Sequence, residues 1–472
     1  MTRATHKPRG SYVHSLTDRR VHVVGASGAE GSALLLYLAG ERGLKGLVGH
    51  DFSADFRAFA RSFRKTNLAW DKDAREERLR RLRRLPVEFK LRENYLDGLS
   101  EAEVILASQN WFNYPSNLPA IPDAVAAGAT LLGMVDLALD LFPGTRIGVT
   151  GSNGKSTTSA LISHLLRTGL TEGRKMMQGG NDRERQVALA DLERAASSDV
   201  LLWEVSNRHL RDREVPVDIA VLTNITRNHI EDHGSWEAYV SAKLRLPQAA
   251  LRDGGHAVLC VDDPVTMSHL HKLRRLGGSL WLVGSNAMEL ALPSEGAGRV
   301  DEQGRLKIRA PGDSASWDAG PAAALALAGT HNQNNLLGAL CASLAAGGVA
   351  DDLAGSIPSF GSLSGRLETV ANEAGVRWIY DIQATTAPAA EAGIDATAPE
   401  AGRLLLIVGG EDKGMDFRGM ARAASEASAR VLALPGSGTE ALRENVEGKT
   451  PEELRARLAD AGFKPSPRQP DL

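Results

Sequence analysis

The chain has 472 residues, of which 43% are apolar and 24% charged, and its formal net charge is -3. This is the composition of a globular protein long enough for two to four domains, and the small net charge excludes a global field that would draw it to nucleic acid or to a membrane. The two cysteines, Cys260 and Cys341, lie far apart in apolar runs, so a disulfide framework is not expected and a reducing cytoplasm fits best. The polar, basic start of the chain has no apolar core typical of a secretory signal, and no apolar run reaches the ~20 residues of a membrane span. We therefore expect a cytoplasmic protein that is not inserted in a membrane.

A strand, a glycine-rich turn and a helix open the chain. The apolar residues 21–24 run into a turn with three glycines, after which a helical pattern begins. Two further strand-like segments, residues 47–48 and 104–107, are each followed by polar side chains. This order is typical of a doubly wound α/β domain, in which ligands bind at the C-terminal ends of the strands. Taken alone, the glycine cluster is also compatible with a plain tight turn.

Residues 57–86, between these strands, are rich in arginine and could form a nucleic-acid-binding patch. However, Leu79, Leu82 and Leu85 recur every three residues, and nearby acidic residues offset the positive charge. This pattern favours an amphipathic helix on the surface, with no nucleic-acid partner.

The most informative motif follows the strand-like residues 146–150 and opens a long helix; it reads Gly151, Ser152, Asn153, Gly154, Lys155, Ser156, Thr157. A loop at such a junction directs backbone N–H groups and the positive end of the helix to one point, where phosphate oxygens bind. Lys155 would reach the β and γ phosphates, and the Ser156 hydroxyl would bind Mg²⁺. The general phosphate-loop pattern requires a glycine where Val149 stands, so a glycine-rich turn that merely contains a lysine is the alternative. The junction of strand, loop and helix favours a nucleotide site.

Strands and helices continue to alternate to the end of the chain. After residue 358, strand-like residues 376–380, 404–408 and 431–434 alternate with helical stretches such as 417–429. Alternation throughout predicts parallel sheets covered by helices. We expect three α/β domains: a Rossmann-like N-terminal domain (residues 1–138), a central phosphate-loop ATPase domain with a mainly parallel sheet (139–358), and a Rossmann-like C-terminal domain (359–472).

Further short motifs occur in the order that one enzyme family has them: residues 178–181, 202–206, 224–229, 329–332, 365–368, 380–385 and 409–417. With its phosphate loop, the chain resembles the Mur ligases, the ATP-dependent amide ligases of bacterial cell-wall synthesis, and most closely their glutamate-adding member. The resemblance implies an ADP-forming ligase that joins UDP-N-acetylmuramoyl-L-alanine to D-glutamate through an acyl phosphate. It implies a cytoplasmic monomer that uses ATP and two Mg²⁺ ions. The N-terminal domain would bind the uridine nucleotide, the central domain ATP, and the C-terminal domain glutamate.

The resemblance also assigns roles to individual residues. The ATP contacts would be residues 151–157 with Asn332, Arg366 and Asp381. The catalytic residues would be Lys155, Glu204, His229 and Lys243. The metal ligands would be Ser156, Glu204, His229 and Lys243, the last as a carbamate. The contacts of the uridine nucleotide substrate would be Ser27, Gly28, Asp51, Ser108, Asn110, Asn181 and Ser206. The glutamate contacts would be Thr385 and Lys413.

Three of these residues have ordinary alternatives. Glu204 could be an exposed acid at the end of a strand, His229 a structural histidine, and Lys243 an ordinary lysine on a surface helix. A carbamate forms only from a neutral amine, so the role of Lys243 requires burial or nearby cations that lower its pKa.

The chain departs from the family pattern at three places. The family's serine-lysine-alanine-threonine-asparagine stretch is residues 382–386 here, with Gln383 in place of the lysine. Its serine-serine-phenylalanine-glutamine stretch is Ser206, Asn207, Arg208 and His209. Its late glutamate-binding loop of the serine-proline-alanine type has no match, and the proline-rich residues 463–472 follow instead, so the C-terminal sheet is expected to be truncated, without its last strands.

Two rivals to the D-glutamate ligase therefore remain open. One is a related ligase that uses L-glutamate or another amino acid. The other is a pseudoenzyme that binds ATP without turning it over, because the late glutamate loop has no match.

Overall fold

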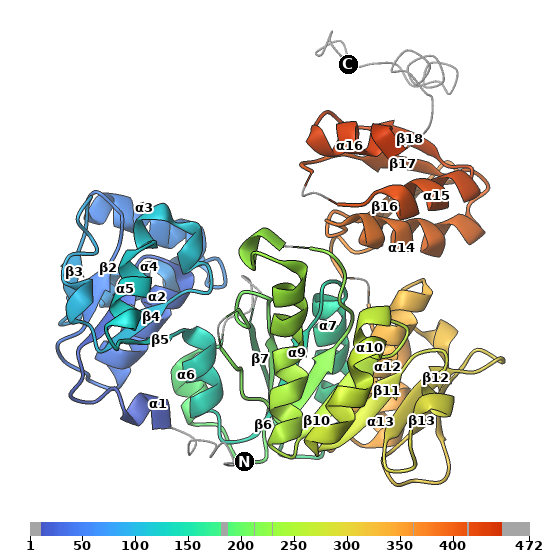
Figure 1. Cartoon of the computed structure of the whole chain (residues 1–472), viewed down its shortest axis with the longest axis horizontal. Helices are drawn as coiled ribbons and strands as arrows, with labels where there is room; N and C mark the ends of the chain where they lie inside the picture. The colour runs from blue at the N-terminus through green and yellow to red at the C-terminus, as the bar shows by residue number, and fades with distance from the viewer. Residues whose placement is uncertain are drawn as a thin grey trace. The chain divides into compact units, whose positions relative to one another are not determined.

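The computed structural model describes residues 11–180, 187–211, 213–228, 230–361, 363–412 and 415–445, whose elements are traced in Figure 1. They form two compact units: the first takes in residues up to 225, 231–324 and 334–359, and the second takes in residues 226–230, 325–333 and those from 360 onward. Within these described ranges, no helix combines the length and the apolar character needed to cross a membrane.

The N-terminal part of the first unit is a five-stranded parallel sheet in the order β3-β2-β1-β4-β5. Its strands are β1 (Val21–Val24), β2 (Val48–His50), β3 (Glu88–Lys90), β4 (Val104–Ala107) and β5 (Thr130–Leu132). Its helices are α1 (Ser11–His14), α2 (Ala29–Leu35) with a π-helical turn (Leu36–Glu41), α3 (Phe56–Thr66), α4 (Lys72–Arg84), α5 (Ala120–Ala126) and α6 (Met134–Leu141), with 3₁₀ turns at Leu99–Glu101, Trp111–Asn113 and Pro115–Asn117. The strand order reverses between β1 and β4, which is where doubly wound sheets bind ligands.

The arginine-rich segment forms two helices, α3 and α4. Asp71 begins α4 by accepting a hydrogen bond from the Ala74 amide, and Leu79 and Leu82 of α4 are buried. The amphipathic pattern predicted for this segment is therefore confirmed, with Leu79 and Leu82 in the core and Arg80, Arg81, Arg83 and Arg84 exposed.

The central part of the first unit is a nine-stranded sheet in the order β14-β13-β12-β11-β10-β9-β6-β8-β7, parallel from β7 to β12 and antiparallel from β12 to β14. The strands are β6 (Thr145–Thr150), β7 (Met176–Gly180), β8 (Val200–Glu204), β9 (Ile219–Leu222), β10 (His256–Cys260), β11 (Ser279–Val283), β12 (Gly296–Val300), β13 (Arg305–Arg309) and β14 (Trp317–Pro321). The helices are α7 (Lys155–Gly169), α8 (Leu189–Glu193), α9 (Trp236–Arg252), α10 (Pro264–Leu273), α11 (Ala287–Leu290), α12 (Thr330–Ala345) and α13 (Ala350–Ser356), with 3₁₀ turns at Ile230–Asp232, Arg274–Leu276, Ala322–Ala324 and Ile357–Ser359. The mainly parallel α/β architecture is thus confirmed.

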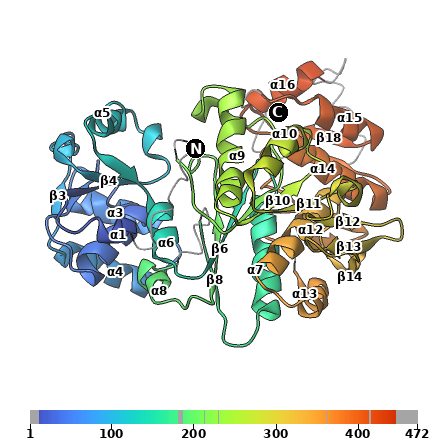
Figure 2. The same cartoon turned by 60° about the horizontal axis from the view of Figure 1, so that its bottom comes forward.

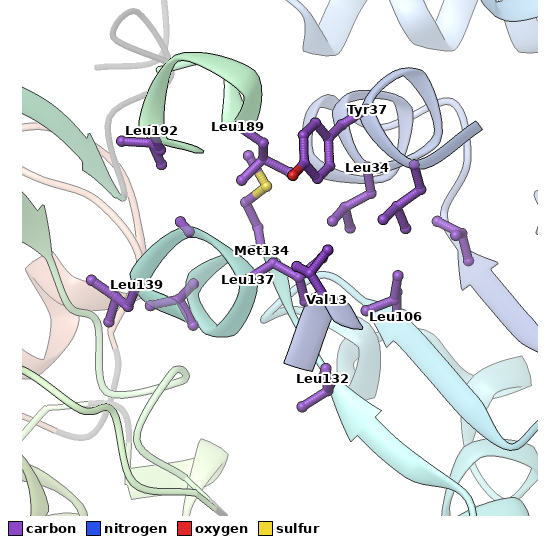
Figure 3. Close-up of a cluster of buried hydrophobic side chains, with 14 of the residues drawn as sticks. Val13, Leu34, Tyr37, Leu106, Leu132, Met134, Leu137, Leu139, Leu189 and Leu192 are labelled. Atoms are coloured by element: carbon purple, nitrogen blue, oxygen red, sulfur yellow. The ribbon is translucent and has the colours of Figure 1, made fainter. Parts of the chain in front are cut away.

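Helix α6 lies between the two sheets of the first unit (Figures 1 and 2) and joins their cores. Figure 3 shows side chains of one continuous apolar cluster, contributed by α1, α2 with its π-helical turn, β4, β5, α6 and α8. The labelled members are Val13, Leu34, Tyr37, Leu106, Leu132, Met134, Leu137, Leu139, Leu189 and Leu192. Burying a leucine side chain contributes about 1.5–3 kcal/mol, so this shared core holds the two sheets as one body.

The second unit contains two small sheets and three α-helices of its own. Its elements are β15 (Glu368–Glu373), β16 (Val376–Tyr380), α14 (Ala387–Thr397), a 3₁₀ turn (Ala398–Glu400), β17 (Leu405–Val408), α15 (Arg418–Glu426), β18 (Arg430–Ala433) and α16 (Ser437–Asn445). Strands β15 and β16 pair antiparallel, whereas β17 and β18 pair parallel. The helices pack with Ile394, Phe417, Met420 and Leu442 in a separate core. The truncation expected for the C-terminal sheet concerns residues after 445, which lie outside the described residues.

Two histidines that the sequence analysis did not single out are buried together in the N-terminal sheet. His22 on β1 is 6% exposed and His50 on β2 is 0% exposed, and their rings stack with centroids 5.0 Å apart. His50 Nδ1 bonds to the carbonyl of Tyr95, which can only accept, so His50 carries its proton on Nδ1. His50 Nε2 therefore accepts from His22 Nδ1, at 2.8 Å. Burial lowers the pKa of both rings, and burial together with the neighbouring His50 lowers the pKa of His22 to about 4.

This pair should make the fold sensitive to acid. Above pH ~6.5 both rings are neutral in the folded and the unfolded chain; below it the unfolded chain binds protons that the folded pair resists, so stability is lost as the pH falls toward 4. Between pH 6.5 and 5, the unfolding free energy of the wild type should fall by about 2 kcal/mol more than that of His22→Asn, whose amide can still donate to His50. Urea unfolding of both proteins at both pH values measures the difference. An equal fall of the unfolding free energy in the wild type and in His22→Asn would contradict the prediction.

Candidate active site

The phosphate-loop candidate connects β6 to α7, as predicted. Two of its glycines have positive φ, +152° at Gly151 and +81° at Gly154. A Cβ on Gly151 would overlap the Thr223 side chain, and a Cβ on Gly154 would lie 2.5 Å from Asn335 Oδ1. Both positions therefore require glycine, because neighbouring elements press against the backbone of the loop.

The segment after β9 holds the loop in shape. The Ser152 amide donates to the carbonyl of Asn224 at 2.9 Å. The Asn224 side chain accepts from the Asn153 amide at 2.9 Å and donates back to the Asn153 carbonyl at 3.1 Å. Thr223 Oγ1 donates to the same carbonyl at 2.5 Å. Sequence reasoning singled out Asn224 only as part of a family motif, whereas its position shows that it orders the loop backbone.

Lys155 folds back over the loop. Its Nζ donates to the carbonyls of Gly151 and Ser152 at 2.8 and 2.9 Å. Ser156 and Thr157 lie in the first turn of the fifteen-residue helix α7, where the helix dipole favours negative charge. A bound phosphate could replace the two carbonyls as the acceptor for this ammonium group, which is the chemistry expected of a phosphate-loop lysine.

Glu204 lies beside the loop. It is the last residue of β8, which pairs with β6 so that Glu204 stands opposite Val149. The side chain is 7% exposed, so the exposed strand-end acid considered above does not describe it. A buried carboxylate next to a phosphate site is suited to a divalent cation.

Lys243 of α9 points into the same place. Its side chain is 1% exposed, and its Nζ donates to the carbonyl of Gly151 at 2.8 Å and to Thr150 Oγ1 at 3.2 Å. Burial, and then the charge of Lys155, lowers the pKa of Lys243 well below its usual value, while Glu204 acts in the opposite direction. Lys243 is therefore not an ordinary surface lysine. Its amine is buried, and burial favours the neutral form.

Five candidate contacts for a uridine nucleotide lie at the carboxyl edge of the N-terminal sheet: Ser27, Gly28, Asp51, Ser108 and Asn110. The Ser27 amide donates to Asp51 Oδ2 at 2.7 Å, and Asp51 Oδ1 accepts from Ser53, so the Asp51 carboxylate shapes the glycine turn. Gly28 and Ser108 lie on neighbouring turns of this edge. Asn110 accepts a hydrogen bond from Arg208, and Ser206 donates to Gln109. These two pairs place the Asn110 loop and the segment after β8 in contact within the first unit.

In the second unit, Asp381 follows β16 and accepts from the Leu367 amide at 3.1 Å. Burial raises the pKa of Asp381, while the hydrogen bond from the Leu367 amide and the nearby Arg366 and His331 side chains lower it in part. Asn332 donates to the carbonyl of Ala328. The backbone amide of Thr385 donates to the carbonyl of Gln383 at 3.0 Å.

Three predicted site residues, Asn181, His229 and Lys413, lie outside the described residues. Within the described part of the chain, no three histidine, cysteine, aspartate or glutamate side chains lie close enough to hold a metal ion. Residues that sequence reasoning gave no role, and that the structure places at the loop, are Thr223 and Tyr239. Only their spacing after the phosphate loop could have hinted at them, because their roles depend on tertiary contacts. Asn335, which the resemblance to the family assigned to the adenine side of the nucleotide, lies against Gly154 of the loop and accepts a hydrogen bond from Thr158.

The fold and the loop together define a nucleotide-binding α/β enzyme of the phosphate-loop class. The Mur ligase middle domain matches residues 149–343, and the Mur ligase, glutamate ligase domain matches residues 365–469. The UDP-N-acetylmuramoylalanine–D-glutamate ligase of Symbiobacterium thermophilum is 32% identical over 380 residues, which are 78% of this chain and 76% of that enzyme. The enzyme of the same name from Acidobacterium capsulatum is 30% identical over 338 residues, 71% of this chain and 69% of that enzyme.

Solved structures show the same fold. The UDP-N-acetylmuramate-alanine ligase from Thermotoga maritima superposes with a TM-score of 0.51 at 15% identity, over 91% of this chain and 88% of that one. A UDP-N-acetylmuramoylalanyl-D-glutamyl-2,6-diaminopimelate–D-alanyl-D-alanyl ligase from Acinetobacter baumannii superposes with a TM-score of 0.50 at 17% identity, over 76% of this chain and 84% of that one. The chain belongs to the Mur ligase family. It is an ATP-dependent, ADP-forming ligase of peptidoglycan precursor synthesis.

Replacing Lys155 by methionine should weaken binding of ADP with Mg²⁺ by about 10- to 100-fold, because a charge-assisted hydrogen bond contributes about 1.5–3 kcal/mol. Isothermal titration calorimetry measures the change. Lys175→Met is the matched control, since Lys175 is an exposed lysine of the same sheet, just before β7. An unchanged affinity in Lys155→Met would remove the assignment of the loop as the phosphate site.

Proposed function

We propose that the protein joins UDP-N-acetylmuramoyl-L-alanine to D-glutamate, with ATP converted to ADP and phosphate. The observation that carries the proposal is the convergence of Lys155 and Lys243 on the carbonyl of Gly151, beside Glu204. The names of the relatives from S. thermophilum and A. capsulatum support D-glutamate as the second substrate.

In the proposed reaction, the carboxylate of the alanyl group attacks the γ-phosphorus of ATP, and ADP leaves. The amine of glutamate then attacks the acyl phosphate, the amide bond forms, and phosphate and a proton leave. Phosphoryl transfer depends chiefly on positioning and charge neutralisation. Lys155 and the backbone amides of residues 151–157 would hold the β and γ phosphates, and so keep the γ-phosphorus in line with the attacking carboxylate.

The oxygen donors around the loop fit magnesium, which prefers hydroxyl and carboxylate ligands. Ser156 and Glu204 would hold one Mg²⁺ ion, and His229 with a carbamate on Lys243 would hold a second. When bound, the ions neutralise charge on the phosphates. The carbamate would form when the neutral Lys243 amine adds to carbon dioxide and loses a proton, which turns a buried cation into an anionic oxygen ligand.

The second unit would supply the remaining contacts. We propose that Asn332, Arg366 and Asp381 contact the nucleotide, and that Thr385 and Lys413 bind glutamate, with Lys413 pairing with a carboxylate. The uridine nucleotide would be held by the first unit, at Ser27, Gly28, Asp51, Ser108, Asn110, Asn181 and Ser206.

The direct assay is phosphate release from ATP and Mg²⁺ with UDP-N-acetylmuramoyl-L-alanine and either enantiomer of glutamate. We expect release only when both the nucleotide substrate and D-glutamate are present. Release with L-glutamate instead would identify the related ligase for that enantiomer. ATP binding without release under any of these conditions would identify a pseudoenzyme and overturn the proposal.

The carbamate makes turnover depend on dissolved carbon dioxide. Dialysis at mildly acidic pH, which decomposes carbamates, followed by assay in carbonate-free buffer should lower turnover several-fold, and added bicarbonate should restore it. Lys243→Gln should have low turnover that bicarbonate does not change. Turnover of the wild type that is the same with and without bicarbonate after this treatment would exclude the carbamate.

A further inference from the structure

A chain of polar contacts runs from the Asn110 loop, on the uridine side of the first unit, to the phosphate loop. It starts at Arg208, which follows β8. The guanidinium donates to Asn110 Oδ1 from Nη1 at 2.7 Å and to Asp232 Oδ2 from Nε at 2.7 Å. One side chain thus bridges the loop after β4 and the loop before α9.

The bridge is sheltered from solvent. The side chain of Asp232 is 7% exposed and that of Arg208 is 26% exposed, and the Arg208 guanidinium lies 5.7 Å from the ring of Phe112. A guanidinium can serve two partners in different directions because its donors form a rigid fork. A lysine carries all its donors on one nitrogen atom, so it could not reproduce contacts that leave from two separate nitrogens, Nη1 and Nε.

From Asp232 the contacts continue to the phosphate loop. The Asn207 amide nitrogen lies 3.5 Å from Asp232 Oδ2 and 3.1 Å from His233 Nε2. The His233 ring packs edge-on against Tyr239, with centroids 5.4 Å apart. The Tyr239 hydroxyl is 2.8 Å from Ser152 Oγ. Each step joins side chains of the first unit.

Two of the residues that make these contacts lie where the chain departs from the pattern of its family. Asn207 and Arg208 stand where the resemblance leads us to expect serine and phenylalanine. The next residue, His209, accepts from the Ser206 amide at 3.1 Å through Nδ1. Neither a serine nor a phenylalanine could donate to both Asn110 and Asp232 as Arg208 does, so the bridge is a feature of this chain rather than of the fold.

We propose that Arg208 is a positioning residue that couples the uridine-nucleotide site to the ATP site, so that a ligand at either site strengthens binding at the other. The proposal rests on the proposed function for the two ligands. A uridine nucleotide that contacts Asn110 fixes the oxygen to which Arg208 donates. It thereby orders Asp232, Asn207 and Tyr239, and the loop at Ser152 then loses less freedom when it takes up phosphate. Coupling of this kind is reciprocal.

The test measures the affinity of the full chain for ADP with Mg²⁺ by calorimetry, with and without saturating UDP. We expect UDP to tighten ADP binding about tenfold in the wild type, within the usual range of allosteric coupling. In Arg208→Ala the factor should fall to about one, while the affinity for ADP alone changes less than twofold. In Arg208→Lys, UDP should tighten ADP binding by an intermediate factor. Replacing a residue with only a structural role would change the affinity for ADP itself, and not just the effect of UDP on it.

Arg252→Ala is the control, because Arg252 pairs with Glu214 on the surface and contacts none of these residues. Should Arg208→Ala fail to fold, Asp232→Asn removes the same ion pair with little change of shape, and it should also abolish the coupling. The proposal is overturned if UDP does not affect ADP binding in the wild type, or if the factor survives in the Arg208 and Asp232 variants. Failure of the proposed function would appear separately, as a wild type that binds both nucleotides but releases no phosphate with its substrates.

Discussion

The carbonyl oxygen of Gly151 accepts hydrogen bonds from two lysine side chains, and the rest of the site depends on that convergence. Lys155 reaches it from the helix that begins in the loop, and Lys243 reaches it from α9. The carbonyl is fixed because Thr223 presses against Gly151 and leaves no room for a side chain. Two ammonium groups at one acceptor repel each other, and burial adds to the cost for the enclosed one. Lys243 therefore loses its proton more easily than Lys155 does. The same geometry thus favours a charged Lys155, which can bind phosphate, and a neutral amine at Lys243.

The parts of the fold and of the site that the sequence predicts are those whose residue patterns lie within a short stretch of the chain. The strand before the phosphate loop, the loop and the helix after it were predicted correctly, because a short apolar run, glycines and a helical pattern are read within about twenty residues. The strand at Val376–Tyr380 was predicted with its observed bounds for the same reason. The antiparallel strands β12, β13 and β14 were not predicted, since they are short and partly polar, and only their pairing makes them strands.

The side chains that hold the site together lie beyond local reasoning. Asn224 and Asn335 lie about 70 and 180 residues after the phosphate loop, and nothing in their own neighbourhood predicts that they hold it. The burial of Lys243 is of the same kind, because a lysine in a helix is usually exposed. The histidine pair of β1 and β2 exists only because two parallel strands place residues 28 positions apart side by side.

The bridge made by Arg208 also shows why a polar contact can be retained where an apolar one would fold as well. Enclosing Arg208 and Asp232 costs desolvation that their attraction offsets only in part, so their pair is weak as a source of stability. A phenylalanine at this position would pack without that cost, but it could not respond to the position of Asn110. The guanidinium of Arg208 fixes the orientation of the loop after β4 relative to the loop before α9. A ligand that changes this orientation at one site therefore affects binding at the other. Because β4, β8 and α9 share one core, a small displacement at one end of the bridge is transmitted rather than absorbed.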